Sequence, residues 1–296
     1  MTTQEMNPTE RELAAIAGIN ESGRQPVVLI HGLWLLAGSW ARWEQLLEQQ
    51  GYAPIAIDWP GEPESVSDAR VDPQALAGPS IDEVTERAEG IIGRLARRPV
   101  VIGHSVGGLV AQKLAGRGVA SAAVAIDPAP FKGLRGLPWS VVKSSFPVLK
   151  SPGNRSRAVT LTLDQFTYGF ANAVPAAEAE ALYQEFHVAA PGRPLFEVAF
   201  ANFSSSSAAK VHTESPERGP LLIISGGADH TVPPSVAKAA HSKQAKNQSP
   251  TEFIEIENAG HSLVIDHRWQ EVATTAIDFM QRSGVAPGRT ADRHLS

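Results

Sequence analysis

Residues 100–108 read VVIGHSVGG, a Gly-x-Ser-x-Gly pattern that directly follows an apolar, β-branched run and leads into a helical pattern. A strand that turns sharply into a helix lifts the central serine above the sheet edge, in a strained turn that exposes its hydroxyl group. Glycines flank such a turn because larger side chains would collide with the neighbouring strand and helix. The segment therefore predicts an α/β fold in which Ser105 is a nucleophile and not an ordinary turn serine.

Short apolar runs alternate with helical patterns on both sides of this segment. The predicted strands lie at residues 27–32, 54–61, 99–103, 122–128, 221–230 and 251–261. The predicted helices lie at residues 39–51, 81–98, 106–116, 235–245 and 264–282. Ser80 and Glu83 have the spacing of a capping box at the start of one helix, and residues 62–80 are predicted to form a loop. This alternation predicts a mostly parallel sheet with helices on both faces.

The alternation stops near residue 129 and resumes near residue 220. We therefore expect a core formed by residues 1–128 and 220–283, a cap insertion at 129–219, and a disordered tail at 284–296. The insertion holds eight of the ten phenylalanines, namely Phe131, Phe146, Phe166, Phe170, Phe186, Phe196, Phe200 and Phe203. Some of these rings must form the insertion's own core, and the others are predicted to line an apolar pocket beside the serine.

Composition excludes several classes of function. The chain of 296 residues has a net charge of −5 and no cysteine. The charge gives no basic field for nucleic acid or anionic lipid, and the absence of thiols excludes disulfides and a cysteine nucleophile. The N-terminal segment lacks the apolar region of a secretory signal, and no apolar run reaches the ~18 residues of a membrane span. We expect a cytoplasmic protein without a nucleic-acid partner, and its oligomeric state stays open.

A serine hydroxyl group needs a base, and the base needs an acid that orients it. In a strand-turn-helix arrangement the acid and then the histidine follow the serine, on loops at the carboxyl ends of later strands. Asp229 follows the run LLIISGGA, and His261 follows FIEIENAG. Asp127 is the rival acid because it also ends a predicted strand. Ser105, Asp229 and His261 are therefore the predicted catalytic residues.

Two backbone N–H groups are expected to stabilise the oxyanion of a tetrahedral intermediate. One belongs to Val106, the residue after the serine. The other belongs to the loop after the first core strand, where Leu33 is the first choice and Trp34 the second. His31 is predicted to brace this loop by hydrogen bonding. The histidines and carboxylates show no spacing typical of metal ligands, so no metal site is expected.

These motifs together resemble the α/β-hydrolase fold superfamily, in its His-Gly-x class. The matching pieces are HGLW (31–34), DWPG (58–61), GHSVGG (103–108), GGADHTVP (226–233) and GH (260–261). The resemblance covers residues 26–128 and 220–282 and implies an inserted, largely helical cap at 129–219. The chain departs from the pattern at its start, where a helix is predicted in place of an antiparallel pair of strands. We therefore expect about six strands.

The superfamily includes enzymes of several chemistries. Its dehalogenases and epoxide hydrolases use an aspartate nucleophile, and serine at position 105 argues against both. The resemblance implies a serine hydrolase that cleaves a carboxylic ester or lactone of an apolar substrate through an acyl-enzyme, without a cofactor. Trp34, Leu35 and Trp139 are the predicted substrate-binding residues. The alternatives are a cofactor-free perhydrolase, a C–C bond hydrolase and a non-catalytic ligand-binding member.

Overall fold

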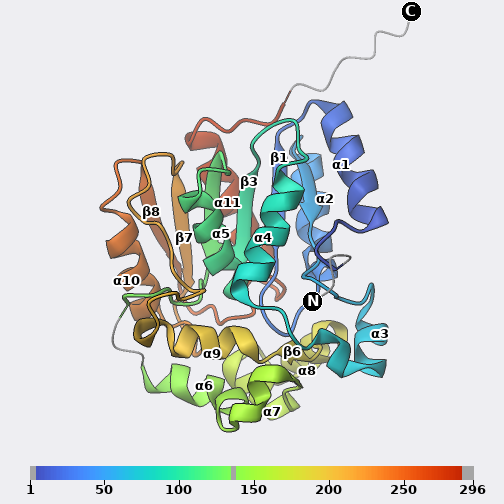
Figure 1. Ribbon diagram of the computed structural model, residues 1–296, viewed down its shortest axis with the longest axis vertical. Helices are drawn as coiled ribbons and strands as arrows, with labels where there is room; N and C mark the ends of the chain where they lie inside the picture. The colour runs from blue at the N-terminus through green and yellow to red at the C-terminus, as the bar shows by residue number, and fades with distance from the viewer. Residues whose placement is uncertain (1–4, 135–137, 289–296) are drawn as a thin grey trace, which may run out of the picture.

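The computed structural model describes residues 5–134 and 138–288. A parallel sheet of six strands forms the centre of the molecule, in the order β2-β1-β3-β4-β7-β8 (Figure 1). The strands are β1 (Pro26–Ile30), β2 (Ala53–Ala56), β3 (Val100–His104), β4 (Ala122–Ile126), β7 (Leu221–Gly226) and β8 (Thr251–Ile256). The four inner strands are buried along their whole length, as expected for a parallel sheet that is covered on both faces. The predicted α/β architecture and strand number are confirmed.

Helices cover both faces of this sheet. On one face α5 (Val106–Gly116) contacts β3 and β4, and α4 (Ile81–Ile92) packs on α5 (Figure 1). On the other face α2 (Ala41–Gln49) contacts α11 (Trp269–Arg282). Helix α10 (Pro234–Gln244) lies against β7 and β8. Every residue of α5 is buried, which makes it the central helix beneath the predicted site.

Two predicted helix boundaries are wrong. The helix predicted at 81–98 ends at Ile92, because Gly93 weakens a helix and Pro99 restricts the residue before it. Its predicted capping box is confirmed: Ser80 and Glu83 each accept a hydrogen bond from the other's backbone. The helix predicted from residue 264 begins at Trp269. Before it, the Ser262 hydroxyl group donates to the Asp266 carboxylate at 2.6 Å, in a turn that competes with a helix.

The loop predicted at 62–80 contains two short helices, α3 (Val66–Val71) and η2 (Pro73–Leu76). The Ser65 hydroxyl group caps α3 by accepting a hydrogen bond from the Asp68 N–H. The spacing Ser-x-x-Asp is typical of a helix N-terminus. The polar composition of the segment predicted a loop and hid this pattern. The prediction of an uninterrupted loop is therefore wrong.

The N-terminal segment forms the predicted helix, α1 (Glu10–Ser22), which packs beside the edge strand β2. Its Glu12 carboxylate pairs with the Arg87 guanidinium of α4 at 2.6 Å, and both side chains are buried. Burial disfavours the charged carboxylate, but the hydrogen bonds and charge of Arg87 outweigh burial and lower the pKa of Glu12. Removing either partner alone leaves a buried charge unpaired, so this pair fixes α1 against the core.

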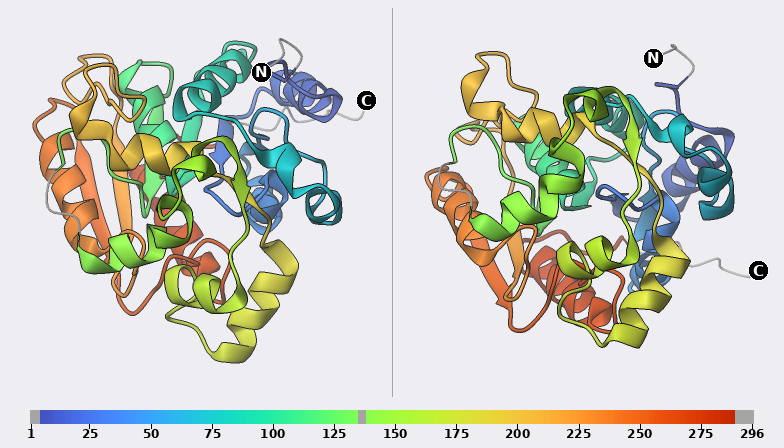
Figure 2. Two further views of the ribbon diagram at one scale, coloured as in Figure 1. Left: turned by 60° about the horizontal axis from the view of Figure 1, so that its bottom comes forward. Right: turned by 90° about the horizontal axis from the view of Figure 1, so that it is seen from below.

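The inserted segment, residues 129–219, lies over the carboxyl ends of the strands (Figures 1 and 2). Its helices are α6 (Trp139–Leu149), η3 (Pro152–Ser156), α7 (Leu163–Gly169), α8 (Ala176–Phe186), α9 (Arg193–Ala199) and η4 (Ala201–Phe203). Two short strands, β5 (Ala158–Val159) and β6 (Ala190–Pro191), pair antiparallel within it. Stacked rings of Phe166 and Phe170, 5.0 Å apart and buried, form the centre of its packing.

The described chain continues past α11. The Tyr52 hydroxyl group donates to the Val285 carbonyl at 3.0 Å, so the start of the predicted disordered tail, 284–296, is held against the core. Residues 289–296 of that predicted tail lie outside the described residues. Among the described residues, no helix has the length and hydropathy needed to cross a membrane.

Candidate active site

Ser105 occupies the turn between β3 and α5. Its backbone has φ 55° and ψ −118°, a left-handed conformation that is rare for a residue with a side chain. A Cβ atom at Gly103 would lie 2.0 Å from the carbonyl oxygen of Gly107, and one at Gly107 would lie 2.2 Å from that of Ile30. Both positions therefore require glycine. The strained turn raises the serine side chain above the sheet, as the motif predicts.

Asp229 and His261 meet above the neighbouring strands. Asp229 follows β7 and His261 follows β8, and His261 Nδ1 lies 2.6 Å from Asp229 Oδ2. The other oxygen of Asp229 accepts hydrogen bonds from the N–H groups of Thr231 at 2.6 Å and Val232 at 2.9 Å. Both carboxylate oxygens are thus held, and a proton on Nδ1 leaves Nε2 of the neutral ring as the acceptor. Among the described residues, His261 Nε2 has no hydrogen-bond partner.

Asp127, the rival acid, is fully buried beside this pair but hydrogen-bonds to the backbone and not to His261. Its Oδ1 accepts a hydrogen bond from the Gly226 N–H at 2.7 Å, and its Oδ2 lies 4.0 Å from His261 Nδ1. Burial, followed by the nearby charge of Asp229, raises the pKa of Asp127 well above its ordinary value. Of the two carboxyl groups, Asp229 is the one in hydrogen-bond contact with His261.

His104, the residue before the predicted nucleophile, hydrogen-bonds to the backbone of His261 and contacts its ring. Its Nε2 lies 2.9 Å from the His261 carbonyl oxygen and donates to it, and the two rings are 4.6 Å apart. Burial, followed by the charge of His261, lowers the pKa of His104 well below its ordinary value, so the ring is neutral. Phe170 of the inserted segment meets the His261 ring edge-on at 5.0 Å. The sequence pattern gave no signal for either contact, because the partners are far apart in the chain.

His104, Asp127 and His261 place potential metal-ligand atoms within 4.8 Å of one another. Two of these groups already have protein partners, since His104 Nε2 donates to a carbonyl and His261 Nδ1 faces Asp229. A ring nitrogen must be free of its proton to bind a metal ion. His104 Nδ1 and Asp127 Oδ2 have no hydrogen-bond partner among the described residues, so the hydrogen-bond network satisfies these three side chains only in part.

Leu33 and Val106, the predicted oxyanion donors, come from the loop after β1 and the first turn of α5. A Cβ at Gly32 would lie 2.7 Å from Ser105 Cβ, so this loop runs directly against the serine. Among the described residues, neither the Leu33 nor the Val106 N–H group donates a hydrogen bond. Buried N–H groups are rarely left unpaired. Two free donors beside one serine hydroxyl group have the composition of an oxyanion hole.

His31 braces this loop, as predicted. Its Nδ1 lies 2.8 Å from the Gly32 carbonyl oxygen, and its Nε2 lies 3.0 Å from the Glu62 carboxylate. Burial opposes the charged ring, but the charge and hydrogen bond of Glu62 outweigh it and raise the pKa of His31. Because both ring nitrogens face acceptors, a doubly protonated ring satisfies both. The Glu62 carboxylate also accepts from the Trp59 N–H at 2.7 Å, which ties the loop to the end of β2.

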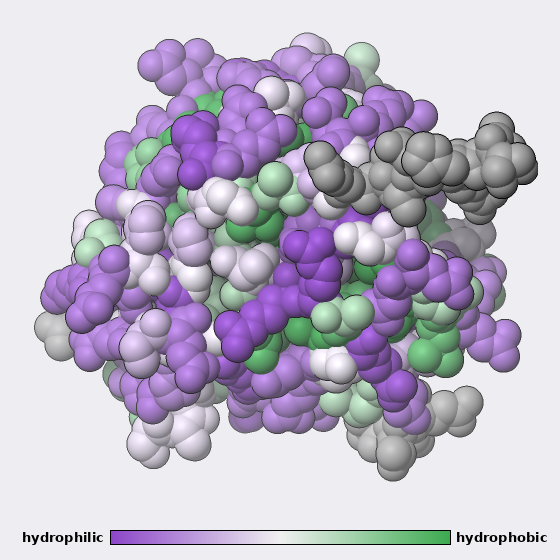
Figure 3. Space-filling model, turned by 90° about the horizontal axis from the view of Figure 1, so that it is seen from above, coloured by the Kyte–Doolittle hydropathy of each residue, from purple (hydrophilic) through white to green (hydrophobic). Residues whose placement is uncertain are grey.

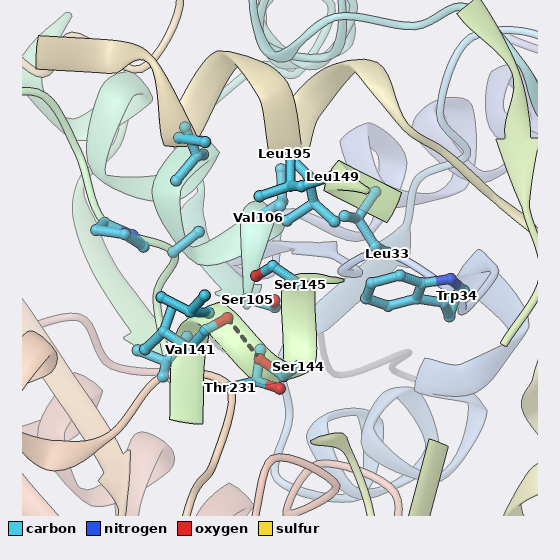
Figure 4. Close-up of a pocket in the computed structure, with 16 residues that line it drawn as sticks. Leu33, Trp34, Ser105, Val106, Val141, Ser144, Ser145, Leu149, Leu195 and Thr231 are labelled. Atoms are coloured by element: carbon cyan, nitrogen blue, oxygen red, sulfur yellow. Dashed lines mark hydrogen bonds between the residues drawn. The ribbon is translucent and has the colours of Figure 1, made fainter. Parts of the chain in front are cut away.

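A cavity of about 230 Å³ opens beside Ser105 (Figure 4). Sixteen residues line it, from the core loops and from α6 and α9 of the inserted segment. Aliphatic side chains such as Val141, Leu149 and Leu195 form most of the wall, with hydroxyl groups from Ser144, Ser145 and Thr231. The Ser144 hydroxyl group donates to the Val141 carbonyl at 3.1 Å (Figure 4). No charged residue is among the sixteen, so the cavity suits an apolar group.

Of the predicted substrate-binding residues, only Trp34 lines this cavity (Figure 4). Its indole N–H donates to the Val159 carbonyl at 3.1 Å, which joins the loop to β5. Leu35 is buried in the core away from the cavity, and Trp139 is 76% exposed on the outer side of α6. The assignments of Leu35 and Trp139 are therefore corrected.

The prediction that phenylalanines of the inserted segment line the pocket is also wrong, since none is among the lining residues. Phe166 and Phe170 are buried and stack on each other, Phe170 also packs against the His104 and His261 rings, and Phe146, Phe200 and Phe203 are exposed. A small layer needs large rings to bury enough apolar area. Smaller side chains beside Ser105 leave the space that a ligand requires.

A family model described as "Alpha/beta hydrolase family" matches residues 27–275, which is most of the chain. The chain belongs to the alpha/beta hydrolase family. The match spans all six strands, Ser105, Asp229, His261 and the inserted segment. This hydrolase therefore has the fold that its sequence motifs predicted. A sequence search against curated proteins gave no significant match.

Solved structures support the same fold. A monoacylglycerol lipase from Paleococcus ferrophilus is 21% identical, with a TM-score of 0.60, over 87% of this chain and 94% of the lipase. An extracellular α/β-hydrolase from a Paenibacillus species is also 21% identical, with a TM-score of 0.61, over 90% and 99%. A pyrethroid hydrolase from Sphingobium faniae is 18% identical, with a TM-score of 0.59, over 87% and 97%. At these identities the likeness establishes the fold.

Proposed function

We propose that this hydrolase cleaves a carboxylic ester or lactone of a small apolar substrate through an acyl-enzyme on Ser105. The observation that carries the proposal is the 2.6 Å contact between His261 and Asp229, combined with an apolar cavity that has Ser105 in its wall. This arrangement supplies a nucleophile, a base and an orienting acid in the order that the fold requires. The esterase, lipase and pyrethroid hydrolase among the similar structures are consistent with ester chemistry.

The proposed reaction has two halves. His261 Nε2 takes the proton of the Ser105 hydroxyl group as the oxygen attacks the ester carbonyl carbon. The resulting oxyanion accepts hydrogen bonds from the N–H groups of Leu33 and Val106. The intermediate collapses, the C–O bond to the alcohol breaks, and His261 returns the proton to the departing alkoxide. Water, activated by the same ring, then attacks the acyl group and releases the acid and the free serine.

Asp229 keeps the imidazole in the tautomer with its proton on Nδ1 and stabilises the cation that forms on Nε2 protonation. We assign Asp127 no proton transfer, because its carboxyl oxygen is 4.0 Å from the ring nitrogen. A hydrogen bond between the Ser105 hydroxyl group and His261 is expected to tighten when a substrate binds.

The size and lining of the cavity support the proposed substrate class. Its volume of about 230 Å³ is below the ~300–1,000 Å³ that is typical of ligand pockets, so the substrate group that it holds must be small. With no charged residue in its lining, we expect it to accept the uncharged acyl group of a short or medium ester. In this proposal the inserted segment acts as a cap, because α6 and α9 supply one wall of the cavity. The cytoplasmic location stays a prediction from sequence.

Turnover tests the proposal against its alternatives. The purified protein should release many equivalents of p-nitrophenol from p-nitrophenyl esters and should open simple lactones, measured beside amides of matched size. A binding protein without catalytic activity gives at most one equivalent. Selective cleavage of a vinylogous 1,5-diketone, with no ester turnover, would instead indicate a C–C bond hydrolase. Formation of peracid from acetate and hydrogen peroxide without ester turnover would indicate a perhydrolase.

A further inference from the structure

Helix α6 has apolar residues on both of its faces. Val141, Ser145 and Val148 point inward and are buried. On the outer side Trp139 is 76% exposed, Phe146 is 59% exposed, and Val142, between them, is 43% exposed. Isolated exposed apolar residues are ordinary, but three on successive turns of one helix form a continuous stripe. The same outer side also carries the exposed Lys143, so α6 presents a mixed apolar and basic face to solvent.

A second group of exposed aromatic rings lies close to the start of α6. Phe203 of η4 is 87% exposed, and Phe200, which precedes it, is also exposed. Between them, the Asn202 side chain donates to the Leu134 carbonyl and accepts from the Gly133 N–H, which are in the segment before α6. Both groups therefore belong to the same outer end of the molecule, where α6 and α9 lie together (Figure 2). The opposite end is largely hydrophilic with small separate apolar patches (Figure 3).

Charge is segregated in the same part of the chain. Residues 129–163 contain six lysines and arginines and no aspartate or glutamate, although the whole chain has a net charge of −5. Lys150, at the end of α6, and Arg155, in η3, are exposed. Within the part of the chain that the structure describes, neither forms an ion pair, and Lys143 of α6 has only the Tyr168 ring as a charge partner. The whole-chain charge concealed this basic region.

The outer stripe of α6 adjoins the cavity. Val142 belongs to both, and the inner residues Val141, Ser145 and Leu149 of the same helix line the cavity wall (Figure 4). A surface bound to the outer side of α6 would therefore lie one helix thickness from the pocket.

We infer that the outer face of α6, centred on Trp139 and Phe146 and flanked by Lys143 and Lys150, docks the hydrolase on an anionic lipid surface. Large apolar rings insert into the boundary between headgroups and acyl chains, and basic residues attract the anionic headgroups. The exposed tryptophan suits this boundary, because its ring is apolar with one polar N–H. This inference adds to the proposed function that the apolar substrate is taken from the lipid surface. Its consequence for catalysis rests on the proposed function.

Vesicle sedimentation tests the docking directly. The full-length protein is mixed with vesicles of equimolar phosphatidylcholine and phosphatidylglycerol, or with vesicles of phosphatidylcholine alone. We expect the protein to sediment with the mixed vesicles, and to do so less as salt is raised. The double variant Trp139→Ala/Phe146→Ala should partition at least about tenfold more weakly, because two rings no longer insert. Lys150→Glu changes the charge by two units and should weaken partitioning about 25-fold, at roughly fivefold for each unit.

Matched controls come from the rest of the surface. Leu13→Ala removes an exposed apolar side chain from α1, and Lys246→Glu reverses an exposed charge outside the inserted segment. Neither should change partitioning. Phe146→Ala should hydrolyse a monodisperse short-chain ester as the wild type does, which shows that its fold is intact. The inference is overturned if the wild type fails to sediment with either vesicle, or if the α6 variants and controls behave alike.

Two further results distinguish docking on lipid from catalysis and from self-association. Ser105→Ala should bind the mixed vesicles like the wild type, because the serine takes no part in docking. If the wild type binds vesicles but does not turn over esters, the proposed function is contradicted and the docking inference still holds. If size-exclusion chromatography shows a dimer that Trp139→Ala/Phe146→Ala converts to a monomer, and vesicles are not bound, the stripe is an interface between two copies and the docking is wrong.

Discussion

The core and the inserted segment differ in how well their sequences predict which residues face the candidate active site. In the core, Ser105, Asp229 and His261 each follow a strand, and parallel strands deliver their ends to one edge of the sheet. In the inserted segment, the aromatic composition predicted that aromatic rings line the pocket. Instead, aliphatic and hydroxyl-bearing side chains of α6 and α9 line it. Strand ends are placed by the topology of the sheet, whereas the inward face of a cap helix is placed by packing. Chemistry is therefore easier to predict from this sequence than specificity.

The largest expected effect tests the core. Ser105→Ala should lower kcat by several orders of magnitude and leave the melting temperature close to that of the wild type, because the triad acts as a unit. An alkyl phosphonate should label Ser105, as peptide mapping by mass spectrometry can check. Recovery of the label elsewhere, or near-normal turnover by the variant, would show that the strained turn is not the reactive centre.

The second prediction separates the two buried carboxyl groups. Asp229→Asn should lower kcat/KM by about 10²–10⁴-fold, because the amide no longer fixes the imidazole tautomer or stabilises its cation. Asp127→Asn should cost less than about tenfold, because the amide oxygen can still accept from the Gly226 N–H and the Asp127 carboxyl group does not hydrogen-bond to His261. Steady-state kinetics on one aryl ester, with circular dichroism as the folding control, provides the comparison. A greater loss for Asp127→Asn would move the acid to the earlier strand.

The third prediction concerns the inserted segment. A buried methylene group contributes about 0.8 kcal/mol, so kcat/KM should rise by up to about fourfold per acyl carbon until the cavity is full, and then fall. Leu149→Phe narrows the cavity and should move the optimum to a shorter chain, with about tenfold loss for longer esters.

A series of p-nitrophenyl esters measures both profiles, and Leu13→Ala on the remote helix α1 is the control. A profile that falls from acetate onward, or that Leu149→Phe leaves the same as in the wild type, would mean that this wall does not select the substrate.

The smallest expected effect concerns the pH dependence of stability. Because the folded-state pKa of His31 is raised, its pairing with Glu62 stabilises the protein fully below about pH 6.5, the ordinary histidine value. That contribution is lost as pH rises through the raised pKa. The difference in free energy of unfolding between wild type and Glu62→Gln should therefore shrink as pH rises, by about 1.4 kcal/mol for each pH unit that separates the ordinary pKa from the raised one.

Urea denaturation between weakly acidic and alkaline pH measures this difference. If the difference were constant across that range, the ring would not be charged in the folded protein, and the loop brace would rest on neutral hydrogen bonds.

The sequence determined the parts of this protein that follow from local backbone rules. The tight strand-to-helix turn around Ser105 requires glycine at 103 and 107, and the apolar runs predict six strands, of which the four inner ones are buried along their whole length. The order of Ser105, Asp229 and His261 in the chain then follows from where those strands end. Helix boundaries such as 92 and 269 were less accurate, because side-chain turns and the following proline compete with the periodic pattern.

Tertiary structure decided what depends on contacts between distant segments. Asp229 and Asp127 both end strands, and only the packing places one at 2.6 Å and the other at 4.0 Å from His261. Helix α6 has apolar residues on two faces, so its pattern did not show that Trp139 faces outward. Periodicity reports that a side chain is apolar, whereas its direction depends on which neighbour fills the space on each side.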